Sequence, residues 1–106
     1  MSEHNKLVRD GIPALLARRG VRSETRRLSG ERLVTALRAK VDEELAEYDA
    51  AAADDDALNE LADVLEVVYA LAASRGGEAR ELDERRARKA RERGTFRQGI
   101  ELLRTG

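Results

Sequence analysis

The pattern of hydrophobic and polar positions predicts two long helices in the middle of the chain. The first, from about residue 30 to about residue 52, carries large apolar residues at spacings of three and four: Leu33, Leu37, Val41, Leu45 and Tyr48. The second is predicted over residues 57–74, and its apolar positions cover most of its circumference. Because a helix that is apolar on nearly every side has to be surrounded, we expect this second helix to lie inside a bundle.

A run of three aspartates, Asp54 to Asp56, separates the two helices, and we expect it to end the first and cap the second. So short a turn makes the pair an antiparallel hairpin. Two such hairpins from two chains would complete a four-helix bundle. The expected fold is therefore all-α, with residues 1–106 forming a single domain that gains its bundle by dimerisation.

Shorter elements precede the hairpin. Pro13 predicts a short helix that ends at Gly20 and follows an extended segment from Asn5 to Gly11. Residues 21–28 show no helical stripe and are interpreted as a connector. Ser29 is then expected to cap the first long helix.

Beyond the hairpin, a third helix is predicted from Glu78 to about Arg93, and Gly94 is expected to stop it. Leu82 is its only large apolar residue, so most of this helix should face solvent. The tail of residues 95–106 holds enough apolar side chains that we expect it to dock on the protein.

Composition supports the all-α class and narrows the chemistry. The chain of 106 residues has the size of one domain, and its 3% aromatic content and single proline favour packed helices over a sheet. The absence of cysteine excludes disulfides, thiolate nucleophiles and the common zinc sites, and the single His4 cannot form a histidine site alone.

Charge and hydropathy bear on partners and location. With 20 basic and 21 acidic residues the net charge is −1, so the chain as a whole offers nucleic acid no strong attraction. Its first residues lack the apolar core of a signal peptide, and the most apolar stretch, residues 61–73, is interrupted by Asp63 and Glu66. These features predict a cytoplasmic protein that does not contact membranes.

Two glutamates lie where a purely structural helix would place apolar residues. At 100° per residue, Glu44 falls inside the apolar arc of the first long helix, between Leu33 and Leu45. Glu60 is likewise framed by apolar neighbours on the second helix. An ionised glutamate in such a stripe is costly unless it is paired or bound to a metal ion.

Each long helix carries a pair of acids three residues apart, Glu44 with Glu47 and Glu60 with Asp63, and an antiparallel hairpin can bring the pairs face to face. Two like charges about 5 Å apart repel by roughly 3 kcal/mol at an effective dielectric of about 20, so four carboxylates together require a cation. Oxygen ligands without His or Cys select Mg²⁺ or Mn²⁺. For either pair alone a solvated helix surface is the simpler explanation. The two pairs together favour a metal site.

Four stretches of the chain, residues 5–13 (NKLVRDGIP), 43–47 (EELAE), 60–63 (ELAD) and 89–96 (KARERGTF), resemble motifs of the MazG-like, all-α nucleotide pyrophosphohydrolases. That superfamily includes the relatives of phosphoribosyl-ATP pyrophosphohydrolase. Residues 43–47 (EELAE) and 60–63 (ELAD) are similar to its EExxE and ExxD motifs. Residues 5–13 resemble the NKLVRDKIP start of one branch, except that Gly11 replaces the usual lysine. Residues 89–96 are similar to the KxxxRGGF element, with Thr95 in place of the second glycine.

The resemblance assigns roles to residues of this chain. It implies that the four carboxylates hold Mg²⁺, with Glu44, Glu47 and Glu60 also taking part in catalysis. It implies that Lys89 and Arg93 hold phosphate oxygens. Lys6, Arg9 and Lys40 are the remaining candidates for contact with the substrate. Two structural alternatives stay open. Basic residues of the third helix can pair with acids four residues away, as expected for Glu81 and Arg85, and Asp10 can pair with an arginine to clamp the N-terminal segment.

The activity implied is Mg²⁺-dependent hydrolysis of a nucleoside triphosphate or related nucleotide to the monophosphate and pyrophosphate, with a glutamate accepting the proton of the attacking water. A second hypothesis is a catalytically inactive nucleotide-binding or dimerisation module on the same scaffold. A third, nucleic-acid binding through residues 80–93, is disfavoured by the acids interspersed there. A homodimer and a homotetramer are both compatible with the sequence.

Overall fold

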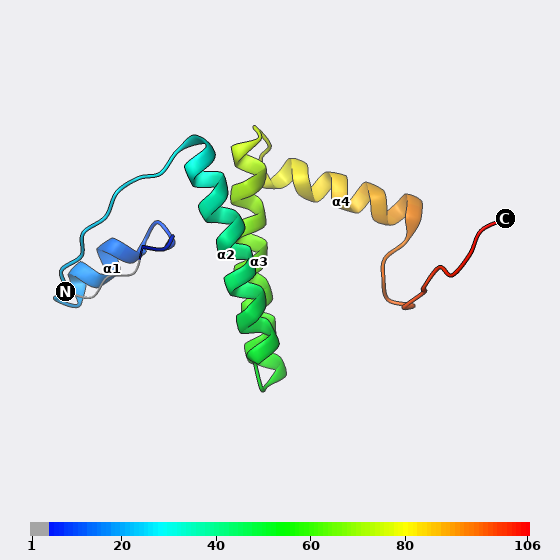
Figure 1. The fold of residues 1–106 in the computed structure, drawn as a ribbon, viewed down its shortest axis with the longest axis horizontal. Helices are drawn as coiled ribbons and strands as arrows, with labels where there is room; N and C mark the ends of the chain where they lie inside the picture. The colour runs from blue at the N-terminus through cyan, green and yellow to red at the C-terminus, as the bar shows by residue number, and fades with distance from the viewer. Residues whose placement is uncertain (1–4) are drawn as a thin grey trace.

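The computed structural model of the chain describes residues 5–106, so residues 1–4, His4 among them, lie outside it. The described residues contain four helices and no strand (Figure 1). The helices are α1 (Ile12–Arg18), α2 (Gly30–Ala50), α3 (Asp54–Ser74) and α4 (Ala79–Arg93). The expected all-α class is confirmed.

Helices α2 and α3 lie side by side as an antiparallel hairpin and form the main packing unit of the chain (Figure 1). The turn between them is Ala51 to Ala53, and the helix begins at Asp54. The expectation that the three aspartates form the turn was therefore wrong. They occupy the first turn of α3, where carboxylates interact favourably with the positive end of the helix dipole.

Little of the hairpin is buried within a single chain. Among the described residues only Leu37 and Glu44 are buried. Leu58 is 64% exposed, and Leu61 and Leu65 are also open to solvent, so α3 is not surrounded as its apolar pattern predicts. Helix α2 covers one stripe of α3 and α4 crosses only its end, which leaves the remaining apolar faces of α3 uncovered.

Helix α4 leaves the end of α3 at a steep angle and runs away from the hairpin (Figure 1). It packs against α3 alone, and the Tyr69 hydroxyl donates a 2.8 Å hydrogen bond to Asp83 near the crossing. Leu82 is half-buried there. Gly94, with φ of 84°, ends the helix in a backbone conformation that glycine adopts without strain.

The tail of residues 95–106 does not dock on the described chain. Phe96 is 99% exposed, and three further apolar side chains are exposed as well: Ile100, Leu102 and Leu103. The expectation of docking is therefore wrong for a single chain. The tail extends beyond α4, away from the α2–α3 hairpin (Figure 1).

The segment before α2 is equally open. Within residues 5–106, α1 packs against no other helix. Ser29 stands at the predicted N-cap position of α2 with extended backbone, although its hydroxyl accepts no capping hydrogen bond.

The overall dimensions reflect this open arrangement. The radius of gyration is 17.7 Å, against about 13 Å for a compact domain of this length. The accessible surface is 9702 Å², against about 5,900 Å² for a compact monomer of 11.8 kDa. Of the helices in residues 5–106, none has the length and apolar character needed to cross a membrane.

Candidate metal centre

Three of the four predicted carboxylates meet in the half of the hairpin that is nearer to its turn. Glu44 and Glu47 stand one turn apart on α2, and Glu60 faces them from α3. Each offers an oxygen, and these oxygens all lie within 4.8 Å of one another. The two acidic motifs, separated in sequence by twelve residues, are thus brought together by the hairpin.

Burial makes this cluster different from a solvated group of acids. Glu44 is only 6% exposed, as its place in the apolar arc predicts, and Glu60 is half-buried. Oε2 of Glu44 and Oε2 of Glu60 are both buried without a hydrogen-bond partner. Ionised carboxylates only accept hydrogen bonds, so neither glutamate can satisfy the other unless one is protonated. A buried polar atom without a partner requires an explanation, and a cation supplies one.

The proton affinity of Glu60 reflects the same arrangement. Burial, and next the hydrogen bond and charge of Glu47, raise the pKa of Glu60 to about 7, with Glu44 and Asp63 adding to the effect. Without a metal ion, the cluster therefore retains a proton near neutral pH that an ordinary glutamate would lose.

Lys40 supplies part of the missing positive charge. Its Nζ lies 3.3 Å from Oε1 of Glu44 and 3.4 Å from Oε2 of Glu43, and only 20% of its side chain is exposed. Burial alone would lower the pKa of Lys40, but the hydrogen bonds and charges of the two glutamates outweigh it and raise the pKa. Lys40 engages one oxygen of Glu44 and leaves Oε2 without a donor.

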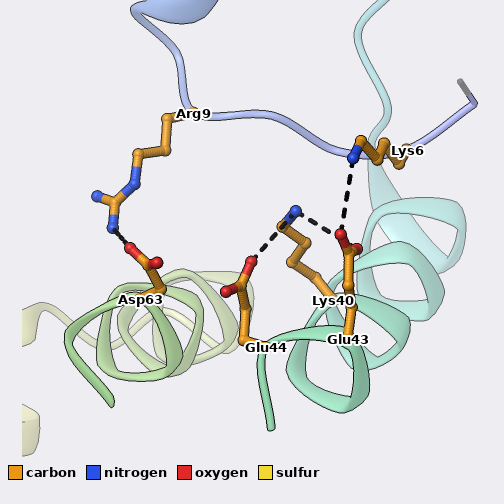
Figure 2. Close-up of polar contacts among 6 residues, drawn as sticks. All are labelled: Lys6, Arg9, Lys40, Glu43, Glu44 and Asp63. Atoms are coloured by element: carbon orange, nitrogen blue, oxygen red, sulfur yellow. Dashed lines mark hydrogen bonds and ion pairs between the residues drawn. The ribbon is translucent and has the colours of Figure 1, made fainter. Parts of the chain in front are cut away.

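The N-terminal arm, residues 5–11, crosses above the hairpin and directs two cations at its acids (Figure 2). Arg9 donates a 2.6 Å hydrogen bond from Nη2 to Oδ1 of Asp63, and its Nη1 lies 3.8 Å from Glu66. Lys6 Nζ lies 3.7 Å from Oε1 of Glu43. Asp63 thus pairs with Arg9 and is absent from the cluster of three glutamates.

This arm corrects one sequence-based alternative. A clamp exists, but its acid is Asp63 and its arginine is Arg9, while Asp10 takes part in none of the ion pairs of the described chain. Glu43 and Glu66 also receive cations of the arm, and the side chain of Glu66 stays 60% exposed. No sequence signal marks these pairings, because the partners lie far apart along the chain.

Lys89 and Arg93 are not brought to the carboxylates in this chain. Both lie on α4, which contacts α3 near Tyr69 and then leads away from the hairpin (Figure 1). Lys89 is six residues beyond Asp83, or about 9 Å further along the helix. The charged face of α4 instead shows the expected i, i+4 pairing, with Arg85 3.1 Å from Glu81 and Arg80 3.5 Å from Glu84.

Two surface hollows lie away from the cluster. One, of about 530 Å³, is lined by residues of α3 and the start of α4, including Tyr69, Ala73 and Gly77. The other, of about 560 Å³, lies where the start of α2 meets the end of α3 and includes Leu33 and Val34. Neither is lined by a carboxylate of the cluster.

The donor set fits a hard divalent cation. Mg²⁺ binds oxygen at about 2.0–2.1 Å in octahedral geometry, so opposite ligands of one ion stand about 4.2 Å apart. Adjacent ligands of the same ion stand about 2.9 Å apart, so the glutamate oxygens, which lie within 4.8 Å of one another, would move closer together on binding it. Such an ion would be bound through lone pairs of the unpartnered oxygens of Glu44 and Glu60.

Comparison with models of known protein families gives no match. No similar chain is found among curated proteins or solved structures either.

Proposed function

We propose that this chain is a Mg²⁺-dependent nucleotide pyrophosphohydrolase of the MazG-like type. The observation that carries the proposal is the carboxylate of Glu44: its Oε2 is buried without a hydrogen-bond partner, and the residue clusters with Glu47 and Glu60. A structural helix has no use for an unpaired carboxylate at such a position. The motif resemblance adds the class of substrate, a nucleotide with a phosphoanhydride bond.

In this proposal Glu44, Glu47 and Glu60 hold Mg²⁺, and Asp63 completes the set. The bound ion would neutralise phosphate charge and lower the pKa of the attacking water. The water oxygen forms a bond to the α-phosphorus, the bond from that phosphorus to the bridging oxygen breaks, and pyrophosphate leaves with the electron pair. A glutamate of the cluster accepts the proton of the water.

The cations around the cluster bind and orient the phosphates. Lys40 already stands 3.3 Å from Glu44, and Lys6 and Arg9 reach the rim of the same site from the arm. Arginine and lysine provide a planar and a flexible donor to phosphate oxygens, respectively. Lys89 and Arg93 are assigned to phosphate by the resemblance alone.

A second copy of the chain belongs to the proposed active form. The chain exposes roughly 3,800 Å² more surface than a compact monomer of its mass, which is more than the roughly 1,000–2,500 Å² that each subunit of an obligate homodimer buries. Two α2–α3 hairpins packed through exposed residues of α3 such as Leu61 and Leu65 would make a four-helix bundle. That bundle would surround α3 as its apolar pattern requires.

Pyrophosphate release from a panel of nucleoside triphosphates in the presence of Mg²⁺ tests the activity. Glu60→Gln keeps the size of the side chain and removes a ligand charge, and we expect at least a 100-fold loss of kcat. Glu92→Gln, an exposed residue of α4, is the matched control and should leave the rate unchanged. Full activity in Glu60→Gln, or no pyrophosphate from any nucleotide, contradicts the proposal.

The second candidate is a nucleotide-binding module without turnover. It is favoured by one observation, the engagement of Asp63 by Arg9, which leaves three carboxylates in the cluster. This function predicts that nucleotide and Mg²⁺ raise the melting temperature while no product forms. Measuring both quantities on the same sample separates the two functions.

A further inference from the structure

The N-terminal arm is attached to the hairpin by side chains of the carboxylate site itself. Its contacts include the 2.6 Å hydrogen bond from Arg9 to Asp63 and the 3.7 Å ion pair from Lys6 to Glu43. The helix that follows the arm, α1, packs against no other helix of residues 5–106. The position of the arm therefore depends largely on these charged pairs (Figure 2).

Asp63 is the residue on which this attachment depends most. It lies one turn after Glu60 on α3, yet its carboxylate receives a guanidinium and stands outside the cluster formed by the other three acids. Arg9 thus gives Asp63 a positive charge, as Lys40 does for Glu44. The pair is short but open to water, with 55% of the Arg9 side chain and 39% of the Asp63 side chain exposed. Exposed ion pairs of this kind are individually weak.

A divalent cation among the three glutamates would place a second positive charge beside this guanidinium. Like charges in proximity repel, and a carboxylate on the next turn is a better ligand for the ion than for an exposed arginine. We propose that Arg9 is an exchangeable counter-ion of Asp63. Cation binding draws Asp63 into the cluster and releases the N-terminal arm from the hairpin.

The inference rests on the proposed metal site and adds an order of events to it. In the metal-free protein Arg9 and Lys6 neutralise acids of the site. In the metal-bound protein Arg9, still tethered beside the site, becomes a free donor for the phosphates of a substrate. The arm is then flexible when only Mg²⁺ is bound, and it becomes ordered again when the phosphates of the substrate bind.

Backbone ¹⁵N relaxation of the full chain, with Mg²⁺ alone as the probe, measures the release. We expect order parameters of residues 7–10 near 0.8 without Mg²⁺ and below about 0.6 at saturating Mg²⁺, the range of flexible backbone. Asp63→Asn, which cannot hold the guanidinium as an ion pair, should show the low values with and without the ion. An arm that stays ordered or becomes more ordered with Mg²⁺ overturns the exchange.

Mg²⁺ affinity, measured by calorimetry, gives a second readout of the competition. Arg9→Gln removes the competing cation, so it should bind Mg²⁺ about two- to fivefold more tightly, the factor that corresponds to an exposed ion pair. Arg104→Gln, which removes the same charge from the tail, should change the affinity by less than 1.5-fold. Unchanged or weaker binding by Arg9→Gln means that Arg9 supports the metal-bound state, which contradicts the exchange.

The two proposals fail in different ways. If the wild-type chain and Arg9→Gln both fail to bind Mg²⁺, the metal site itself is wrong and the exchange falls with it. If Mg²⁺ binds and Glu60→Gln abolishes the binding, but the arm does not loosen, the metal site stands and only the exchange is wrong.

Discussion

The α2–α3 hairpin and helix α4 both carry charged side chains one turn apart, but only the hairpin converts that spacing into a cluster. In the hairpin, Glu44 and Glu47 of α2 face Glu60 of α3 across the packed helix pair, which buries Glu44, half-buries Glu60 and leaves Glu47 exposed. On α4, the charges pair within the helix, as Glu81 does with Arg85, and remain exposed. Charged residues one turn apart form a cluster only where a second helix packs against them and reduces their contact with water.

The largest expected difference between the two regions is in stability. Leu37→Ala truncates the buried apolar residue of the hairpin and should lower the free energy of unfolding by about 2–4 kcal/mol. Leu82→Ala, in the half-buried contact of α4, should cost about 1 kcal/mol, since less surface is uncovered. Urea unfolding followed by circular dichroism measures both. Equal losses would mean that α4 is as firmly packed as the hairpin.

Mg²⁺ should stabilise the hairpin through its carboxylates. At a concentration 100 times the Kd, a ligand specific for the folded state adds about 2.7 kcal/mol to the free energy of unfolding. Glu44→Ala should abolish this gain and also stabilise the metal-free protein, because it removes the unpartnered buried oxygen. Melting curves with and without Mg²⁺ test both effects. Glu84→Ala on α4 should leave the stabilisation by Mg²⁺ unchanged. If this variant loses the stabilisation, the ion binds at a site other than the cluster.

Without metal, the stability of the hairpin should depend on pH. The pKa of Glu60 is raised to about 7 in the folded chain, so the folded state holds the proton more tightly than the unfolded state does. This contribution is fully present below about pH 4.5 and is lost as the pH rises through 7. The melting temperature of the metal-free protein should fall over this interval, and Glu60→Gln should flatten the fall. A melting temperature that rises from pH 5 to 7.5 in the wild type and equally in Glu60→Gln would contradict the shift.

The smallest effect is expected on α4. Arg85 and Glu81 form an exposed pair at 3.1 Å, and Arg85→Ala should change the free energy of unfolding by no more than about 0.5 kcal/mol. The change should vanish in 0.5 M salt, which screens exposed charges. A loss above 1 kcal/mol would show that α4 docks on another surface, such as a second copy.

The sequence anticipated much of the hairpin and of its cluster. Apolar spacing predicted both long helices, and the helical arc predicted the burial of Glu44. The turn was placed wrongly, because three aspartates act as well in the first turn of a helix as they do before it. The docking of the tail was also wrong, since apolar content indicates that a surface exists but not whether the same chain can reach it.

By itself, the sequence determined the local geometry: which segments are helical, which residues share a helix face and which acids stand one turn apart. These follow from the fixed rise and rotation of the α-helix. Only the tertiary structure decided that Arg9 meets Asp63 across 54 residues and that α4 carries Lys89 and Arg93 away from the carboxylates. Such contacts depend on how separate segments pack, and periodicity within one segment carries no information about the distance to another.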